Sequence, residues 1–190
     1  MSAHPHFATV RTMLPHEFTE VRDLAAAAFG DDPQISRLFD LLKASWAWDD
    51  DLSFVAEYAG ELAGQVLYTH AFLDTDPQLV DVLVLSPLAV RADLGGRGVG
   101  TQLVTHTLEQ LEARDEPLVF LEGHPGYYPR MGFERGGDLG FTAPSARIPD
   151  DAFMVYRLPG YRPWMRGRLV YPDPFWRADA VGLRGETPPQ

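Results

Sequence analysis

The chain contains no cysteine, and this absence excludes disulfide bridges, thiol nucleophiles and thiolate metal ligands. It also has no apolar run approaching the ~18–20 residues that a membrane-spanning helix needs. Its first residues, MSAHPHFATVRT, lack the basic region and the apolar stretch of a secretory signal. From these absences we expect a soluble, cytoplasmic protein that makes no contact with a membrane.

Positive charge is scarce, because 16 Lys and Arg residues face 27 Asp and Glu residues, for a net charge of −11. A non-specific nucleic-acid binder needs a basic face, so nucleic acid is excluded as a partner. An acidic surface attracts cationic small molecules such as amines, although plain soluble enzymes are often acidic as well. The six histidines are scattered, and apart from the pair His4 and His6 they lack the spacing of ligands, so we expect no metal site.

The apolar sequence is sufficient for one domain, since 45% of the 190 residues are hydrophobic. Periodicity predicts an edge strand at 7–14, helices opened by Pro15 and Pro33, and a meander of strands at 52–59, 62–73 and 79–90. A helix then leads to strands at 117–122, from 132 and at 153–158. The helix between strands 79–90 and 117–122 makes those two strands a parallel βαβ pair. The expected fold class is α/β with a mixed sheet, an antiparallel meander followed by one βαβ unit, and helices on both faces.

The ends of the chain are expected to differ from this domain. Residues 1–158 form the main domain, with residues 1–6 frayed. Residues 159–190 form a C-terminal extension that packs on the same domain, with a disordered tail from residue 182 onwards. The part from 160 to 176 is rich in proline, arginine and aromatic residues, and we interpret it as packing or a lid because the chain as a whole is acidic.

Four glycines, Gly95, Gly96, Gly98 and Gly100, lie between the strand at 79–90 and the next helix. Such a turn lets backbone N–H groups converge at the positive end of the helix dipole, which favours a phosphate or a diphosphate. The loop is not a P-loop, because Thr101 follows without a lysine, and its spacing is not the Rossmann G-x-G-x-x-G. An ordinary tight loop is the alternative, and it explains one or two glycines better than four.

Ser86-Pro87 interrupts the apolar run from Val80 to Val90. Proline cannot donate to a β-ladder, so it predicts a bulge or a broken pairing, unless it only protects an edge strand. A broken ladder would leave free backbone groups at Leu88 and Val90. These groups can pair with an extended ligand that has amides of its own, such as the pantetheine arm of coenzyme A.

Two segments resemble the Gcn5-related N-acetyltransferases (GNAT superfamily). Leu88–Val90 followed by Gly95–Gly100 is similar to the family's motif A, Gln/Arg-x-x-Gly-x-Gly/Ala, although Gly95 occupies the Gln/Arg position. Residues 127–133, YYPRMGF, are similar to the family's Phe-Tyr-x-x-x-Gly-Phe. Within the superfamily, PLAV, GHPGYYPRMGF, FMVYRL and GRLVYPDPFW resemble the YhbS-type group, and the similarity spans about residues 7–176.

The resemblance implies an acetyl-CoA-dependent N-acetyltransferase with a GNAT-like three-layer fold. It acts on a primary amine of a small molecule or peptide, by direct attack in a ternary complex, because the chain has no cysteine and Ser86 lacks an evident His–acid pair. Acetyl-CoA is the co-substrate, no metal is needed, and the protein is a monomer or homodimer. The resemblance places the cofactor on Leu88, Val90, Gly95, Gly96, Arg97, Gly98, Val99, Gly100, Thr101 and Tyr128.

For catalysis, the resemblance implies that Tyr128 is the acid that protonates the leaving sulfur, and that backbone N–H groups near Leu88 meet the developing oxyanion. The base is less determined. Glu122 ends a central strand and is the candidate, although it could equally cap a loop, and His124 is more consistent with a structural role. Some relatives use a glutamate on the fourth strand, where this chain has Val84. The alternatives are a non-catalytic acyl-CoA-binding sensor or interaction module on the same fold, and a generic nucleotide binder.

Overall fold

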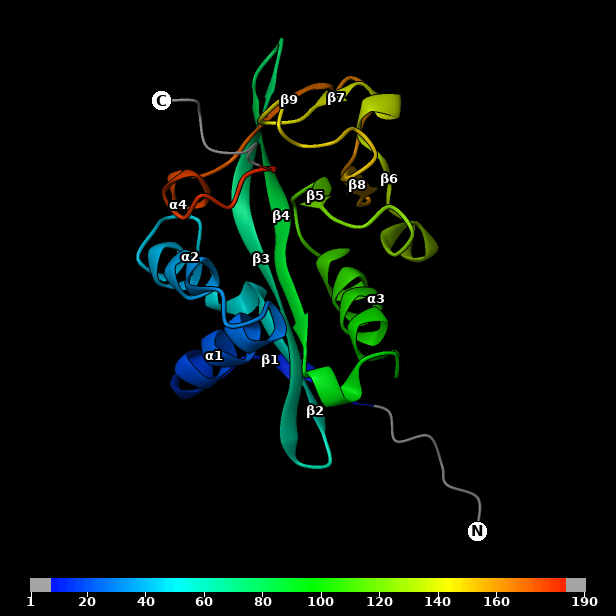
Figure 1. The fold of residues 1–190 in the computed structure, drawn as a ribbon. Coiled ribbons are helices and arrows are strands. Elements are labelled where there is room, and N and C mark those ends of the chain that lie inside the picture. Colours follow the sequence, from blue (N-terminus) through cyan, green and yellow to red (C-terminus); the bar gives the residue numbers. More distant parts are fainter. Residues whose placement is uncertain (1–7, 184–190) are drawn as a thin grey trace, which may run out of the picture.

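The computed structural model describes residues 8–183. Nine strands in this range form one mixed sheet (Figure 1). They are β1 (Thr9–Thr12), β2 (Ser53–Tyr58), β3 (Glu61–Thr75), β4 (Leu79–Val90), β5 (Leu118–Glu122), β6 (Glu134–Arg135), β7 (Phe141–Thr142), β8 (Phe153–Arg157) and β9 (Gly167–Val170). The order is β1-β2-β3-β4-β5-β8-β6, and β9 pairs with β3 and β7. All paired strands are antiparallel except β4–β5 and β7–β9.

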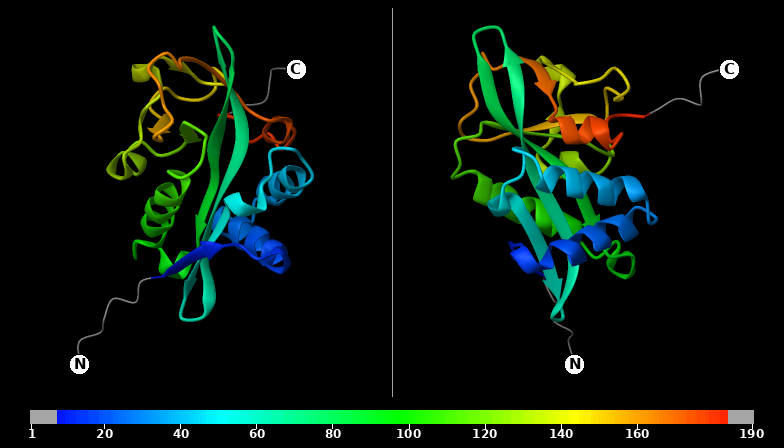
Figure 2. Two further views of the ribbon diagram at one scale, coloured as in Figure 1. Left: turned by 180° about the vertical axis from the view of Figure 1, so that it is seen from behind. Right: turned by 90° about the vertical axis from the view of Figure 1, so that its left-hand side faces the viewer.

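Helices cover both faces of the sheet. Helices α1 (Phe18–Ala28), α2 (Pro33–Lys43) and α4 (Asp173–Arg177) lie on one face, and α3 (Val99–Leu111) lies on the other. Figure 2 shows α1 and α2 side by side across the sheet. Strand β4 faces two separate hydrophobic cores, because its side chains alternate: Val82 and Val84 pack on the α1–α2 side, and Leu83 and Leu85 on the α3 side.

Most of the predicted elements are confirmed. Strand β4 has the predicted bounds, the meander is antiparallel, and β4 and β5 are parallel. Each of the first two helices follows the predicted proline: Pro15 opens a single 3₁₀ turn (Pro15–Glu17) before α1, and Pro33 opens α2 behind an Asp32 cap. Proline suits a first helical turn because that turn lacks acceptors for its N–H groups.

The strand predicted at 153–158 is confirmed as β8, but one further strand follows it that the periodicity did not predict. Gly167–Val170 forms β9, which pairs with β3 from Phe72 to Thr75. The C-terminal segment is therefore part of the main sheet, and α4 packs against α2. Gly182 and Leu183 also differ from the expected disordered tail, because their amides donate to Glu122 and Arg147. The rest of that tail and the expected frayed start lie outside the described residues.

Strand β4 is broken at Ser86-Pro87, as its sequence predicts. These two residues stand opposite one residue of β3, Leu67, and the peptide bond between them is cis. The buried side chain of Gln65 donates from Nε2 to the Pro87 carbonyl at 3.1 Å. Because the bulge interrupts the β3–β4 ladder at Pro87, this hydrogen bond supplies the Pro87 carbonyl with a donor.

Strands β4 and β5 separate beyond this break. Among the described residues they pair at Leu83–Val119 and Val84–Phe120, and then β4 continues to Val90 alone on that side. Strand β5 continues to Glu122, paired with β8. The sheet is therefore split between the second half of β4 and the end of β5.

Candidate active site

The glycine loop leads directly into α3. Gly98 caps the helix with φ +84°, and Gly96 has φ +74°. Both values lie in the left-handed region, which side chains other than glycine rarely adopt. The Gln102 N–H donates to the Gly98 carbonyl at 2.9 Å. The amides of residues 99–101 precede this bond and point out of the helix end, together with the positive end of the helix dipole. This is the geometry of an anion cradle.

A cavity of about 370 Å³ lies at this helix end, and we call it the cradle cavity. All the predicted cofactor residues line it except Arg97 and Tyr128. The Arg97 amide donates to the Leu94 carbonyl at 3.3 Å and thereby holds the loop in shape. The lining residues are Leu88, Val90, Leu94, Gly95, Gly96, Gly98, Val99, Gly100, Thr101, Tyr127 and Arg130.

Besides the apolar Leu94, sequence reasoning missed two of these residues, Tyr127 and Arg130. The Arg130 guanidinium lies 4.4 Å from the centre of the Tyr127 ring, and its Nε donates to the Tyr127 carbonyl at 2.8 Å. A methyl group added at Gly100 would lie 2.6 Å from the Tyr127 hydroxyl. The cradle therefore contains a positioned cation and a close approach that requires glycine. Both residues lie in the YYPRMGF segment, which could have indicated them.

The free edge of β4 presents backbone groups to the split. The Arg91 N–H donates to the Ala63 carbonyl of β3 at 2.9 Å. In an antiparallel pair, N–H and C=O groups alternate in direction along each strand. Leu88 and Val90 therefore direct theirs away from β3, toward the side where β5 has parted from β4. An extended ligand with amides can take the place of the missing strand there.

A second cavity, of about 360 Å³, adjoins the first. Leu88 and Tyr127 line both. The other walls of this second cavity come from the end of α1, from α2, from the β4 bulge, from the end of β5 and from the C-terminal segment. They are Phe29, Ile35, Leu38, Leu85, Ser86, Pro87, Glu122, Gly123, His124, Tyr128 and Ala180. Since Leu38 belongs to one core and Leu85 to the other, this cavity runs through the split sheet.

Tyr128 opens a 3₁₀ turn (Tyr128–Met131) and lines the second cavity. Its ring packs edge-to-face on Tyr127 and Phe133, at centroid distances of 5.0 and 5.7 Å. A side chain at Gly123 would collide with this ring, so the glycine makes room for it. Burial raises the pKa of Tyr128 well above its ordinary value of 10.0. The phenol is therefore protonated at neutral pH and can donate a proton.

Glu122 lies at the end of β5 and lines the same cavity. Its Oε2 accepts the Gly182 N–H at 2.9 Å, and its Oε1 is buried without a hydrogen-bond donor among the described residues. Burial raises the pKa of Glu122 above 4.5, although the Gly182 amide, the Tyr171 hydroxyl and the Arg147 charge act in the opposite direction. A carboxylate with a raised pKa and one free oxygen can accept a proton.

The other candidates for a base have different environments. His124 lines the second cavity, but its Nδ1 accepts the Gly126 N–H at 3.0 Å. In the neutral ring the lone pair is then engaged, and the other nitrogen carries the proton. Val84 is fully buried in the core and pairs with Phe120. Glu122 is therefore the carboxylate that the fold brings to the split.

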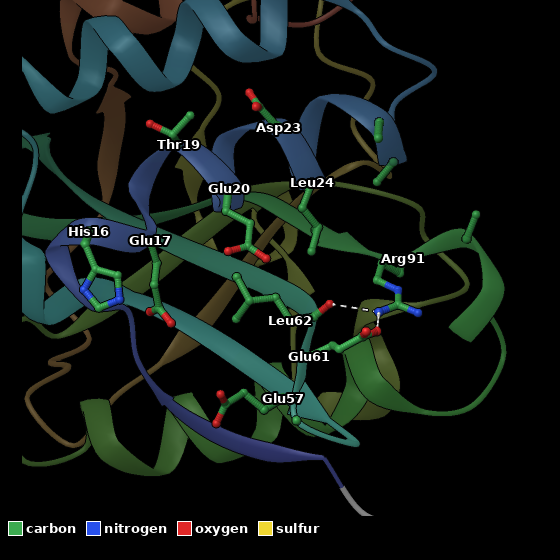
Figure 3. A pocket seen from close by; sticks show the side chains of 14 residues that line it. His16, Glu17, Thr19, Glu20, Asp23, Leu24, Glu57, Glu61, Leu62 and Arg91 are labelled. Carbon is green, nitrogen blue, oxygen red and sulfur yellow. Dashed lines mark hydrogen bonds and ion pairs between the residues drawn. The ribbon is translucent and has the colours of Figure 1, made fainter.

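A larger hollow lies elsewhere and contains none of the predicted site residues. This groove, of about 960 Å³, is formed by α1, the β2–β3 turn and the start of the loop after β4 (Figure 3). Five carboxylates line it, and all of them except Glu20 form ion pairs within the fold. Glu17 and Glu57 pair with Arg11, and Glu61 pairs with Arg91. We interpret this groove as a surface feature stabilised by ion pairs.

Residues 8–183 contain no group of three or more His, Cys, Asp or Glu side chains placed to hold a metal ion. None of the helices described has the length and the apolar character that crossing a bilayer requires.

Comparison with known proteins agrees with this geometry. The profile of the acetyltransferase (GNAT) domain matches residues 9–136. A relative from Escherichia coli (strain K12), "Uncharacterized N-acetyltransferase YjhQ", is 31% identical over 173 residues, which cover 89% of this chain and 94% of the relative. The chain belongs to the GNAT acetyltransferase family. It is therefore an N-acetyltransferase by family, and acetyl-CoA is the acyl donor of that family.

Solved structures show the same fold. The GNAT protein YhbS from Escherichia coli, crystallised in complex with CoA, superposes with a TM-score of 0.80 at 24% identity, covering 93% of this chain and 96% of that chain. A GNAT acetyltransferase from Brucella melitensis, crystallised with acetyl-CoA, superposes with a TM-score of 0.70 at 24% identity. The match covers 90% of this chain and 99% of that chain.

Proposed function

We propose that this chain transfers the acetyl group of acetyl-CoA to a primary amine, by direct attack while both substrates are bound. The observation that carries the proposal is the split between β4 and β5. It joins the cradle cavity on the α3 side to the second cavity, and Leu88 lines both. A long donor in one cavity and a separate acceptor in the other can therefore meet beside Leu88 and Tyr127, which line both.

The cradle has the chemistry that coenzyme A requires. The amides of residues 99–101 and the guanidinium of Arg130 suit a diphosphate. The outward-facing backbone groups of Leu88 and Val90 suit the two amides of pantetheine. Bound acetyl-CoA supplies the thioester that the amine attacks. The YhbS and Brucella structures, crystallised with CoA and acetyl-CoA, support this assignment.

Two side chains then handle protons. A lysine-like amine with a pKa of ~10.4 costs about 4.6 kcal/mol to deprotonate at pH 7, so a base is needed. Glu122 accepts this proton from the ammonium group and later passes it to water. As the carbon–nitrogen bond forms and the carbon–sulfur bond breaks, Tyr128 donates its phenolic proton to the sulfur, and the proton that the new amide nitrogen loses restores the phenol. The Leu88 N–H donates to the acetyl carbonyl oxygen, where negative charge develops.

The test is the Tyr128→Phe variant, which removes one hydroxyl and keeps the ring that packs on Phe133. We expect kcat to fall on the order of 10²-fold, because general acid catalysis contributes that much or more. The Kd of CoA should change little, because Tyr128 does not line the cradle cavity. Thiol release with a panel of amines measures the first quantity and calorimetry the second.

Unchanged turnover in Tyr128→Phe would remove the acid assignment. If wild-type protein bound CoA and released no thiol with any amine, the chain would be an acyl-CoA sensor rather than an enzyme. Protection against thermal unfolding by ATP or NAD as strong as that by CoA would favour a generic nucleotide site.

A further inference from the structure

We propose that the acceptor is a primary amine attached to a compact apolar group, with no second charged group, and that it occupies the second cavity. This inference rests on the proposed function, because it takes that cavity as the acceptor side of the transfer. It is supported by the volume of the cavity, by its apolar walls and by Glu122, the acidic side chain of its lining.

The walls of the cavity that belong to the α1–α2 side are apolar. Phe29, at the end of α1, is 48% exposed and forms part of the rim, whereas Leu38 is buried. Ile35 on α2 and Ala180 of the C-terminal segment are both half-buried. A volume of about 360 Å³ is at the lower end of small-molecule sites. These walls fit a compact hydrocarbon or aromatic group rather than a folded protein surface.

One carboxylate belongs to the lining of this apolar space. Among the residues that line the cavity, Glu122 is the acidic side chain, and none is lysine or arginine. Its Oε1 is buried and has no hydrogen-bond donor among the described residues. A buried carboxylate oxygen without a donor is costly, and an ammonium group from a ligand would satisfy it.

The same set of lining residues argues against more polar acceptors. A polyamine would place a second ammonium group among apolar walls, where an unpaired charge is strongly disfavoured. An amino acid would bring its own carboxylate near Glu122, with no basic side chain on the lining to balance it. A lone amine on an apolar body leaves no group unpaired.

The C-terminal segment holds Glu122 in this position. The Gly182 N–H donates to Oε2 at 2.9 Å, and Gly182 has φ +62°. A methyl group at Gly182 would lie 2.7 Å from the Arg147 backbone. Arg147 in turn donates from Nη2 to the Val181 carbonyl at 2.8 Å. The segment that supplies the Ala180 wall therefore also fixes the carboxylate, and it does so through backbone groups that require glycine.

The experiment compares 2-phenylethylamine, spermidine and free lysine as acceptors. Thiol release with acetyl-CoA gives kcat/KM for each amine, and we expect 2-phenylethylamine to exceed the other two by tenfold or more, because rejection of unpaired polar groups discriminates strongly. Calorimetry of each amine with protein saturated with CoA, which carries no acetyl group, gives binding without turnover. There too, 2-phenylethylamine should bind most tightly.

A variant pair tests the location. Ile35→Thr makes one apolar wall polar and should raise KM for 2-phenylethylamine roughly tenfold, while KM for acetyl-CoA stays unchanged, because Ile35 does not line the cradle cavity. The control is Leu79→Thr, at a position that is 60% exposed at the start of β4 and outside both cavities. This control should leave both KM values unchanged.

The outcomes separate the acceptor class from the reaction. Preference for spermidine or lysine, or an unchanged KM in Ile35→Thr, would overturn the apolar class and leave the transfer reaction standing. Tight binding of 2-phenylethylamine to the CoA complex without thiol release from any amine would support the ligand class and overturn the transfer. Absence of both binding and release would overturn both proposals.

Discussion

The Gly100→Ala variant tests how the cradle is built. The added methyl group would lie 2.6 Å from the Tyr127 hydroxyl, about 1 Å closer than an ordinary contact of ~3.5–4.0 Å. Tyr127 cannot yield freely, because Arg130 stacks on its ring and Tyr128 packs against its edge. Overpacking of this kind costs about 1–3 kcal/mol. If this cost destabilises the complex with CoA and not the free protein, the affinity for CoA drops about 5- to 150-fold.

Calorimetric titration with CoA measures this loss, and the melting temperature of the ligand-free protein shows whether the fold itself has suffered. The matched control is Gly137→Ala, because a methyl group there meets nothing within 4 Å. We expect the control to bind CoA like the wild type. If Gly100→Ala bound CoA within twofold of wild type with an unchanged melting temperature, the cradle assignment would be refuted.

Three further variants test the charges. Since burial raises the pKa of Glu122 above 4.5, wild-type kcat/KM should fall as the pH drops through that raised value. The Glu122→Gln variant should no longer show this decline at low pH, and its kcat should be lower by a factor on the order of 10². pH–rate profiles check both expectations. Arg130→Ala should weaken CoA about tenfold and make its Kd less dependent on salt, which titrations at two ionic strengths would show. Hydrogen bonding to Arg11 lowers the pKa of Glu17 to about 2, so this pair stabilises the fold above pH 4.5 and loses that contribution as the pH falls toward 2. Glu17→Gln should flatten this part of the pH–stability curve in urea titrations; an identical curve would contradict the reasoning.

The elements with strong hydrophobic periodicity were predictable from the sequence. Strand β4 and helix α3 have apolar side chains at the spacing of a buried strand and of an amphipathic helix, and both form where the pattern indicates. Strand β9 was not predictable. It has only four residues, and its sequence does not alternate between apolar and polar side chains. It forms because β3 extends past the end of β2 and offers free backbone partners there.

The candidate site shows the same contrast. The cradle lies within one stretch of chain, so the spacing of Gly95–Gly100 was enough to indicate it. The second cavity joins Phe29, Ser86, Glu122 and Ala180, which are far apart in sequence and meet through packing alone. Gln65 and its bond to Pro87 depend on strand register, which a one-residue slip would change.

The hydrogen bond between Gly182 and Glu122 spans 60 positions in the sequence. During synthesis on the ribosome, the cradle and both halves of the split sheet emerge before the amide that fixes the carboxylate. A nascent chain can therefore form the cradle for its donor before Glu122, its proposed base, is fixed by the Gly182 amide. Docking of the segment around Gly182 against the end of β5 would then be the folding step that completes the proposed catalytic site.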